Sequence, residues 1–246
     1  HGVYDVPAMI DHIIQVTKTP RVSCIGHSMG NAVFMSMLAM RPEYNDKVQM
    51  FVGIAPYSKV RMDFSRFPRF EWLLGTMVGW LKHTKNTKKT DIFRRRKINA
   101  LVGVCWSLPR VCHKAIPLNL DWKLLPVMVG YFPSGTSNKN AKHLFQLRNG
   151  QFRQYDFGQR GNLENYGNMV PPEYDLSKVR VPVSLYYGEV DPIVSVKGMK
   201  AQVKALPNVV KAVIVPKYNH ISFLVDRDTR DAVNIPIIQD LRRFAT

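Results

Sequence analysis

Residues 26–30, Gly-His-Ser-Met-Gly, constrain this chain more than any other feature because of the segments that flank them. Residues 21–25 before them are a short apolar run of β-prone character, and residues 31–40 after them are typical of a helix. A strand, the pattern Gly-x-Ser-x-Gly and a helix in succession predict a sharp turn that exposes the serine hydroxyl at the edge of a sheet. Both glycines are expected to be required, because such a turn brings neighbouring backbone segments very close together.

Hydrophobic patterning on both sides of this turn predicts an α/β fold. Residues 5–17 are expected to form a helix with Ile10, Ile13 and Ile14 on one face, and residues 48–54 have the length and apolar character of a buried strand. Alternating helices and strands are typical of a mostly parallel sheet with crossover helices. The alternation returns late in the chain, with strands expected at 183–187 and 209–215 and helices at 196–206 and 228–244.

Between these two parts, no short apolar strand alternates cleanly with helices. Six apolar residues recur there at helical spacing, namely Phe70, Leu73, Leu74, Met77, Val78 and Leu81. This stripe fits either the core of a helical subdomain or the face of a lid that contacts lipid. We therefore expect a first part of the α/β core at residues 1–58, an inserted helical cap (lid) at 59–175 and a second part of the core at 176–246.

The candidate catalytic residues follow from their order along this fold. Nucleophile elbows of this kind are followed by an acid and then a histidine, each just past a strand. Asp191 comes after the expected strand at 183–187, and His220 comes after the expected strand at 209–215. Ser28 is then expected to attack a carbonyl carbon, while His220 accepts and returns the proton and Asp191 orients the imidazole.

The neighbours of these residues have predicted roles of their own. The backbone N–H of Met29 is expected to donate one hydrogen bond to the oxyanion. Glu189 is the nearest rival to Asp191, and a purely structural turn role remains the alternative for each candidate residue. His27 is expected to pack beside the elbow rather than to transfer protons.

The charge of the chain is strongly positive and uneven. The net charge is +17, and residues 82–97 contain eight basic residues and one aspartate. The eight basic residues are Lys82, Lys85, Lys88, Lys89, Arg94, Arg95, Arg96 and Lys97. The run fits a solvated face or contact with an anionic membrane or lipid-droplet surface. Nucleic acid is not the expected partner, because only Phe93 interleaves with the charges and no nucleic-acid module is present.

Other classes of site find little support in the composition. The three cysteines do not form a disulfide framework: Cys24 is expected to be a buried thiol, and Cys105 and Cys112 are either paired or both free. No cluster has metal-ligand spacing and no glycine-rich phosphate loop is present, so we predict no metal and no cofactor. No apolar stretch reaches the length of about 18 residues that would predict a transmembrane helix. The oligomeric state is unknown from the sequence.

Taken together, the ordered motifs resemble the acid lipase family of α/β-hydrolases, which includes gastric and lysosomal acid lipases. The similar pieces cover nearly the whole chain and lie at residues 4–11, 26–30, 133–137, 155–158, 165–167, 171–174 and 218–220. The resemblance implies a carboxylic ester hydrolase for lipid esters such as triacylglycerols or sterol esters, secreted or lysosomal. It also carries the family's serine, aspartate and histidine onto Ser28, Asp191 and His220.

Departures from the family pattern leave alternatives open. Met29 stands where the family usually has glutamine, and Ser222 stands where it usually has an acid. Residues 82–120 match poorly and are unusually basic, which leaves the substrate range in doubt. A catalytically silent relative that binds lipid, or a serine esterase for smaller substrates, are the competing functions.

The number of residues before the elbow gives a further expectation. An α/β-hydrolase core places several strands before the elbow strand, whereas only about 20 residues precede it here. We therefore expect an N-terminally truncated fold whose first strand is a free sheet edge. The second oxyanion donor is expected to lie outside this chain, and losing one such donor typically lowers the rate by about 10²–10³. The chain alone is thus expected to be poorly active.

Overall fold

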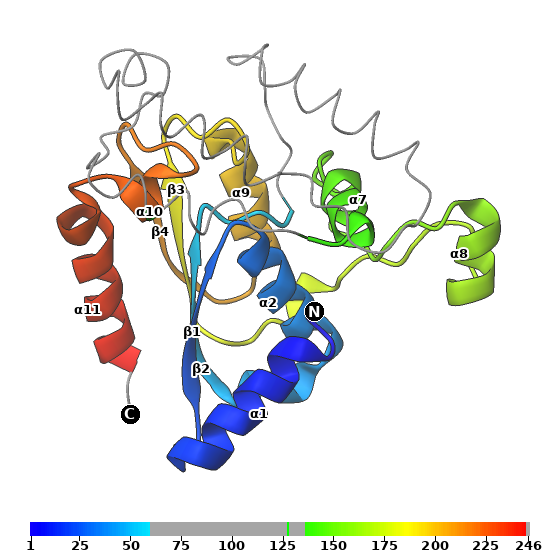
Figure 1. The fold of residues 1–246 in the computed structure, drawn as a ribbon, viewed down its shortest axis with the longest axis horizontal. Coiled ribbons are helices and arrows are strands. Elements are labelled where there is room, and N and C mark those ends of the chain that lie inside the picture. The colour runs from blue at the N-terminus through cyan, green and yellow to red at the C-terminus, as the bar shows by residue number, and fades with distance from the viewer. Residues whose placement is uncertain (60–126, 128–135, 245–246) are drawn as a thin grey trace.

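The computed structural model describes residues 1–59, 127 and 136–244, and its centre is a parallel sheet (Figure 1). The four described strands are β1 (Val22–His27), β2 (Val48–Ile54), β3 (Val183–Gly188) and β4 (Val209–Val215). They pair in parallel in the order β1-β2-β3-β4. The predicted parallel α/β architecture is confirmed, and the bounds of β2 and β4 match those expected from the sequence. Because all four strands run the same way, the loops that follow them meet at one edge of the sheet.

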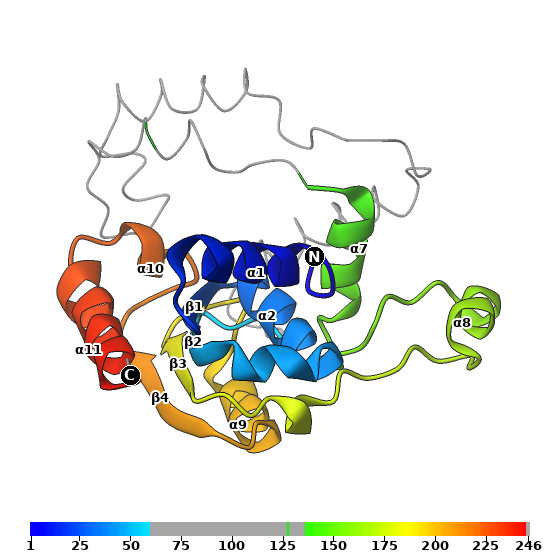
Figure 2. The same ribbon diagram turned by 90° about the horizontal axis from the view of Figure 1, so that it is seen from below.

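Helices cover both faces of this sheet. Figures 1 and 2 show α1 (Asp5–Thr17), α2 (Met29–Met40) and α9 (Val196–Ala205) on one face and α11 (Ile235–Phe244) on the other. Short helical segments lie at η1 (Pro42–Asp46), η3 (Leu176–Lys178), α10 (Ser222–Val225) and η4 (Arg230–Asn234). Two more helices, α7 (Asn138–Gln146) and α8 (Gln159–Tyr166), belong to the region expected to form the cap.

Successive side chains of the central strands point to opposite faces of the sheet, so the apolar core consists of two clusters. Phe51 and Leu185 point into the cluster beneath α1, α2 and α9, whereas Val52 and Tyr186 point into the cluster beneath α11. β2 and β3 are buried almost throughout, which explains why both read as continuous apolar runs. β1 lies at one end of the described strand order, and its Ile25 is 49% exposed.

Two details differ from the sequence predictions. Ile13 does not share the buried face of α1, because Ile10 is buried and Ile14 packs on the core while Ile13 is half exposed. The expected helix at 228–244 is also not uniform: a π-helical turn, η4, precedes α11. Pro236 accounts for this, since proline has no N–H for the α-helical ladder but is well accommodated in the first turn of a helix.

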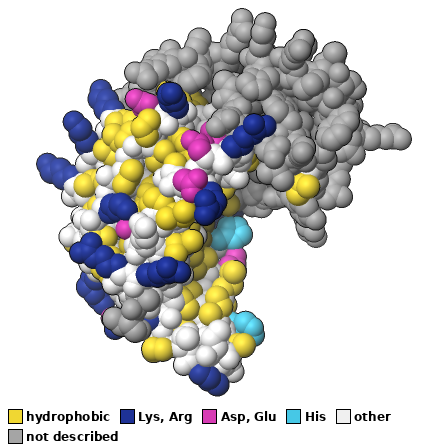
Figure 3. Space-filling view, turned by 90° about the vertical axis from the view of Figure 1, so that its left-hand side faces the viewer, with side chains coloured by type: hydrophobic (Ala, Val, Ile, Leu, Met, Phe, Trp, Pro, Cys, Tyr) yellow, Lys and Arg dark blue, Asp and Glu magenta, His cyan; other side chains and the backbone are white. Residues whose placement is uncertain are grey.

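Several sequence predictions fall outside the described residues. The apolar stripe from Phe70 to Leu81, the basic run at 82–97, and Cys105 and Cys112 all lie there. Within the described part, no helix is both long enough and apolar enough to cross a membrane. The described core is itself basic: Figure 3 shows lysines and arginines spread over the face that carries α11. The exposed arginines of this region include Arg227, Arg230, Arg242 and Arg243.

Cys24 is a free and buried thiol in the middle of β1, as predicted. Burial raises the pKa of this thiol to about 12, so almost no reactive thiolate forms at neutral pH.

We expect iodoacetamide to alkylate the peptide containing Cys24 at least about a hundredfold more slowly in the native protein than in guanidinium chloride. Peptide-resolved mass spectrometry measures both rates, and equal rates would contradict the packing of β1.

Candidate active site

The backbone at Ser28 turns sharply from β1 into α2. Its φ is +52° and its ψ is −116°, a left-handed conformation that non-glycine residues seldom adopt. The N–H of Ser28 donates to the carbonyl of Ile54 at 3.0 Å, and the carbonyl of Ser28 accepts from the N–H of Asn31 at 3.0 Å. This geometry places the side chain of Ser28 at the carboxyl edge of the sheet, as the elbow pattern predicts.

The two glycines of the elbow differ in their surroundings. A Cβ at Gly26 would lie 3.0 Å from the carbonyl carbon of Gly30 and 3.1 Å from the backbone nitrogen of Asn31. Close backbone approach therefore favours glycine at position 26. A Cβ at Gly30 would meet no heavy atom within 4 Å in the described part of the chain. The expected close approach is thus found at Gly26 and not at Gly30.

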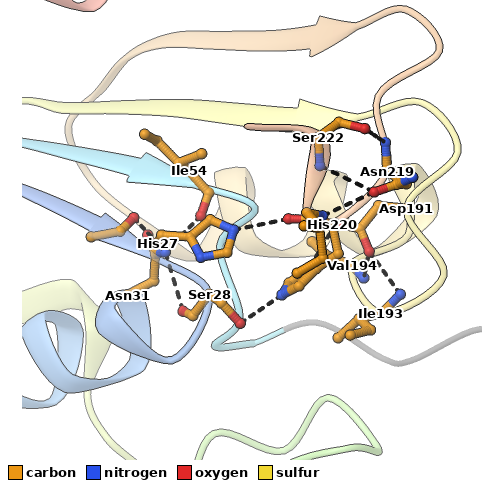
Figure 4. Close-up of polar contacts among 12 residues, drawn as sticks. His27, Ser28, Asn31, Ile54, Asp191, Ile193, Val194, Asn219, His220 and Ser222 are labelled. Carbon is orange, nitrogen blue, oxygen red and sulfur yellow. Dashed lines mark hydrogen bonds and ion pairs between the residues drawn. The ribbon is translucent and has the colours of Figure 1, made fainter. Parts of the chain in front are cut away.

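Ser28, His220 and Asp191 lie in a continuous chain of hydrogen bonds (Figure 4). The Nε2 of His220 is 2.6 Å from the Oγ of Ser28, and its Nδ1 is 2.8 Å from the Oδ2 of Asp191. A carboxylate can only accept, so Nδ1 carries the proton and the bare Nε2 accepts from the serine hydroxyl. The Asp191 side chain is fully buried and that of His220 is 8% exposed.

The loop after β3 fixes the acid. The Oδ1 of Asp191 accepts from the backbone N–H groups of Ile193 at 2.7 Å and Val194 at 2.9 Å, which leaves Oδ2 for His220. Glu189, the rival acid, is exposed, and its carboxylate accepts from the backbone N–H of Lys217 at 2.9 Å. Two backbone donors and one imidazole therefore fix the carboxylate plane of Asp191.

The loop after β4 fixes the histidine. The side-chain oxygen of Asn219 accepts from the N–H groups of Ile221 (2.9 Å) and Ser222 (3.1 Å), and the Oγ of Ser222 accepts from the N–H of Asn219 (3.1 Å). This reciprocal pair closes a tight turn around His220. Ser222 thus stabilises this turn, at the position where the acid lipase family usually has an acid.

The loop after β3, which carries Asp191, and the loop after β4, which carries His220, are also in direct contact. The N–H of Val190 donates to the carbonyl of Tyr218 at 3.0 Å. A Cβ at Gly188 would collide with that same carbonyl oxygen and lie 2.9 Å from its carbon. Glycine at position 188 therefore allows the two loops to cross at the distance that brings Asp191 to His220.

Met29 occupies the first helical position after Ser28 and contacts the cap region. The first N–H groups of a helix have no intrahelical partner, so the N–H of Met29 is one of the groups available to a ligand. The Sδ of Met29 accepts from the side-chain amide of Asn140 at 3.2 Å. Asn140 also donates to Thr136 at 2.8 Å, so the described end of the motif at 133–137 reaches the elbow.

Two of the remaining pieces of the family resemblance, at residues 155–158 and 165–167, are joined by aromatic contacts. The ring of Phe157 contacts those of Tyr155 and Tyr166 at centroid distances of 4.8 and 5.9 Å. The hydroxyl of Tyr166 donates to the carbonyl of Tyr155 at 2.9 Å. Phe152 packs against Tyr174, with ring centroids 4.6 Å apart and planes inclined by 47°. The segments at 155–158 and 165–167, which match the family separately in the sequence, are therefore packed together in space.

Comparisons with known proteins find similar sequences among hydrolases. The family model described as serine aminopeptidase, S33 (Hydrolase_4) matches residues 1–106. Lipase 1 of Drosophila melanogaster is 31% identical over 98% of the chain and 56% of its own length, and mouse gastric triacylglycerol lipase is 26% identical over 96% and 62%. The sequence of this chain is thus similar to those of lipases over nearly its whole length. It spans between half and two thirds of the length of these two relatives.

The fold of this chain also matches a solved structure. The monoacylglycerol lipase of Paleococcus ferrophilus superimposes with a TM-score of 0.55 at 16% identity, covering 99% of this chain and 76% of that one. Identity this low supports the fold alone. The predicted α/β-hydrolase fold is thereby confirmed.

Asn31 is a buried residue of the elbow that no sequence pattern singled out. Its side-chain amide donates to the carbonyls of Gly26 (2.8 Å), Ser28 (3.2 Å) and Ile54 (3.1 Å), and the residue is 0% exposed. One side chain thus ties the ends of β1 and β2 to the strained backbone of Ser28. The only hint in the sequence is an amide residue that opens an otherwise apolar helix.

Asn31 also explains the glycine at position 53. A Cβ at Gly53 would collide with the Oδ1 of Asn31 and lie 2.8 Å from the Cδ2 of Leu185. We expect Asn31→Ala to lower the free energy of unfolding by about 2–4 kcal/mol, because the carbonyls of Gly26 and Ile54 lose a donor in buried contacts and that of Ser28 loses one in a part-buried contact. We expect Gly53→Ala to be destabilising by itself and milder in the Asn31→Ala background.

Chemical denaturation of the two single variants and the double variant measures this coupling. We expect the double variant to lose about 1–3 kcal/mol less free energy of unfolding than the sum of the losses in the two single variants. Strictly additive losses would show that Asn31 does not determine the glycine at position 53.

Proposed function

We propose that this α/β-hydrolase is a serine ester hydrolase, a lipase, that cleaves lipid esters through an acyl-enzyme. Ser28 is the nucleophile, His220 the general base and then the general acid, and Asp191 the residue that orients the imidazole. The observation that supports this best is the hydrogen-bonded chain of 2.6 Å and 2.8 Å from Ser28 through His220 to Asp191. A separate structural role for each of these residues would not need all three in one line.

The chemistry follows from the positions of the protons. As the Oγ of Ser28 bonds to the ester carbon, its proton moves to the Nε2 of His220, and the resulting imidazolium is stabilised by the buried Asp191 carboxylate. His220 then gives the proton to the alcohol as the ester bond breaks. Water repeats the sequence on the acyl-enzyme, with His220 again as the base, and releases the carboxylic acid.

The N–H of Met29 supplies one donor for the oxyanion in this scheme. Two features support the assignment: the N–H is at the first position of α2, and a helix N-terminus favours negative charge. The contact between Asn140 and Met29 engages the side-chain sulfur of Met29, so its backbone N–H takes no part in that contact.

Substrate, location and partners follow from the relatives. Lipase 1 and gastric triacylglycerol lipase are named for lipid substrates, and we infer triacylglycerol or sterol esters at a lipid–water interface for this chain as well. A secreted or lysosomal location and a cap inserted at 59–175 belong to the same proposal. Contact of the basic run at 82–97 with an anionic membrane is consistent with the exposed arginines of the described core.

Hydrolysis of fluorogenic esters with short and long acyl chains tests the proposal, using the natural polypeptide that carries these residues. We expect Ser28→Ala to lower kcat/KM by at least about 10⁴-fold and Asp191→Asn by about 10³–10⁴-fold, since the amide stabilises the wrong imidazole tautomer. Glu189→Gln is the matched control, because it changes a neighbouring carboxylate that accepts from the backbone of Lys217, whereas Asp191 is the partner of His220. It should change kcat/KM by less than about threefold.

The pattern of results separates the competing functions. Ser28-dependent hydrolysis that favours long acyl chains supports a lipase, whereas a preference for short chains supports a smaller-substrate esterase. Lipid binding without hydrolysis would identify a catalytically silent relative. An equal loss in Glu189→Gln and Asp191→Asn would contradict the assignment of the acid.

A further inference from the structure

His27 connects the nucleophile strand to the histidine loop. It is the last residue of β1, and its Nε2 lies 2.9 Å from the main-chain carbonyl oxygen of His220, 193 residues away in sequence (Figure 4). The two imidazole rings are also in contact, with centroids 5.2 Å apart and planes inclined by 49°. This contact is more specific than the packing role that the sequence predicts for His27.

The carbonyl acceptor in this contact determines which nitrogen of His27 carries a proton. A carbonyl oxygen can only accept, so the Nε2 of His27 must carry a proton and donate it. Burial is the largest cause that lowers the pKa of His27, and the nearby His220 lowers it further; the hydrogen bond to the carbonyl and the Asp191 carboxylate oppose this, and the pKa remains below its usual value. His27 is therefore a neutral donor whose N–H points at the backbone of the residue that must approach Ser28.

The topology gives this hydrogen bond its importance. β1 and β4 are at opposite ends of the described strand order, so Ser28 and His220 arrive from elements that do not pair with each other. Reaction requires them to meet with near-ideal separation, and small displacements of a catalytic group are costly. Besides the bond between Ser28 and His220 themselves, the bond from His27 ties the β1 end directly to the backbone of His220.

We propose that His27 is a positioning residue, which sets the approach of His220 to Ser28 by donating a hydrogen bond to the main-chain carbonyl of His220. The inference rests on the proposed function, because it assigns a role relative to the same nucleophile and base. His27 takes no proton from the substrate in this account. Its loss should therefore slow the attack by Ser28 while leaving substrate binding unchanged.

Two variants of similar size separate donation from packing. His27→Leu keeps much of the volume and removes the donor, whereas His27→Gln keeps an N–H that can reach the carbonyl. We expect His27→Leu to slow covalent labelling of Ser28 by a fluorophosphonate, and to lower kcat for ester hydrolysis, by about 10–100-fold with KM unchanged. His27→Gln should recover most of both rates, and thermal unfolding of each variant reports any loss of folding.

The outcomes distinguish this inference from the function on which it rests. If the wild-type protein is not labelled at Ser28, the proposed function fails. If it is labelled, and His27→Leu reacts as fast as wild type or His27→Gln as slowly as His27→Leu, the positioning role is wrong.

A measurement on the wild-type protein covers the case in which His27→Leu does not fold. The imidazole ¹⁵N chemical shifts of His27 should identify a neutral ring with the proton on Nε2. A proton on Nδ1 alone would overturn the inference.

Discussion

The strained backbone of Ser28 is the constraint on which the rest of the site depends. A positive φ at a non-glycine residue costs on the order of 1–3 kcal/mol, and it persists only where the surroundings enforce it. Here the surroundings are the backbone bond to Ile54, the close approach at Gly26 and the three hydrogen bonds of the buried Asn31 amide. Together they hold the hydroxyl of Ser28 where His220 can reach it.

The parallel sheet explains why three distant segments meet at this point. The loops after β1, β3 and β4 all leave the same edge, and the glycine at 188 lets the last two cross in contact. Asp191 and His220 are each positioned by a turn of their own loop, whereas Glu189 is held by the backbone of Lys217 in the neighbouring loop. The arrangement of Ser28, His220 and Asp191 therefore depends on all the loops at the carboxyl edge of the sheet.

Much of this could be predicted from the sequence, for a physical reason. The elbow pattern, the apolar strand lengths and the order Ser28, Asp191, His220 are local or sequential features, and parallel topology converts them into proximity. The contributions of Asn31 and His27 could not be predicted in the same way. Both act on main-chain carbonyls of other segments, and every residue has a carbonyl, so such contacts leave no pattern in the sequence.

The most direct test of the account is whether an acyl group from a lipid ester becomes bonded to Ser28. The natural polypeptide is mixed with a long-chain ester, quenched in acid during turnover, digested and analysed by mass spectrometry. The account predicts the mass of one acyl group on the peptide that contains Ser28, and none in the Ser28→Ala variant. Sustained hydrolysis with no adduct on that peptide, or with an adduct on another residue, would contradict it.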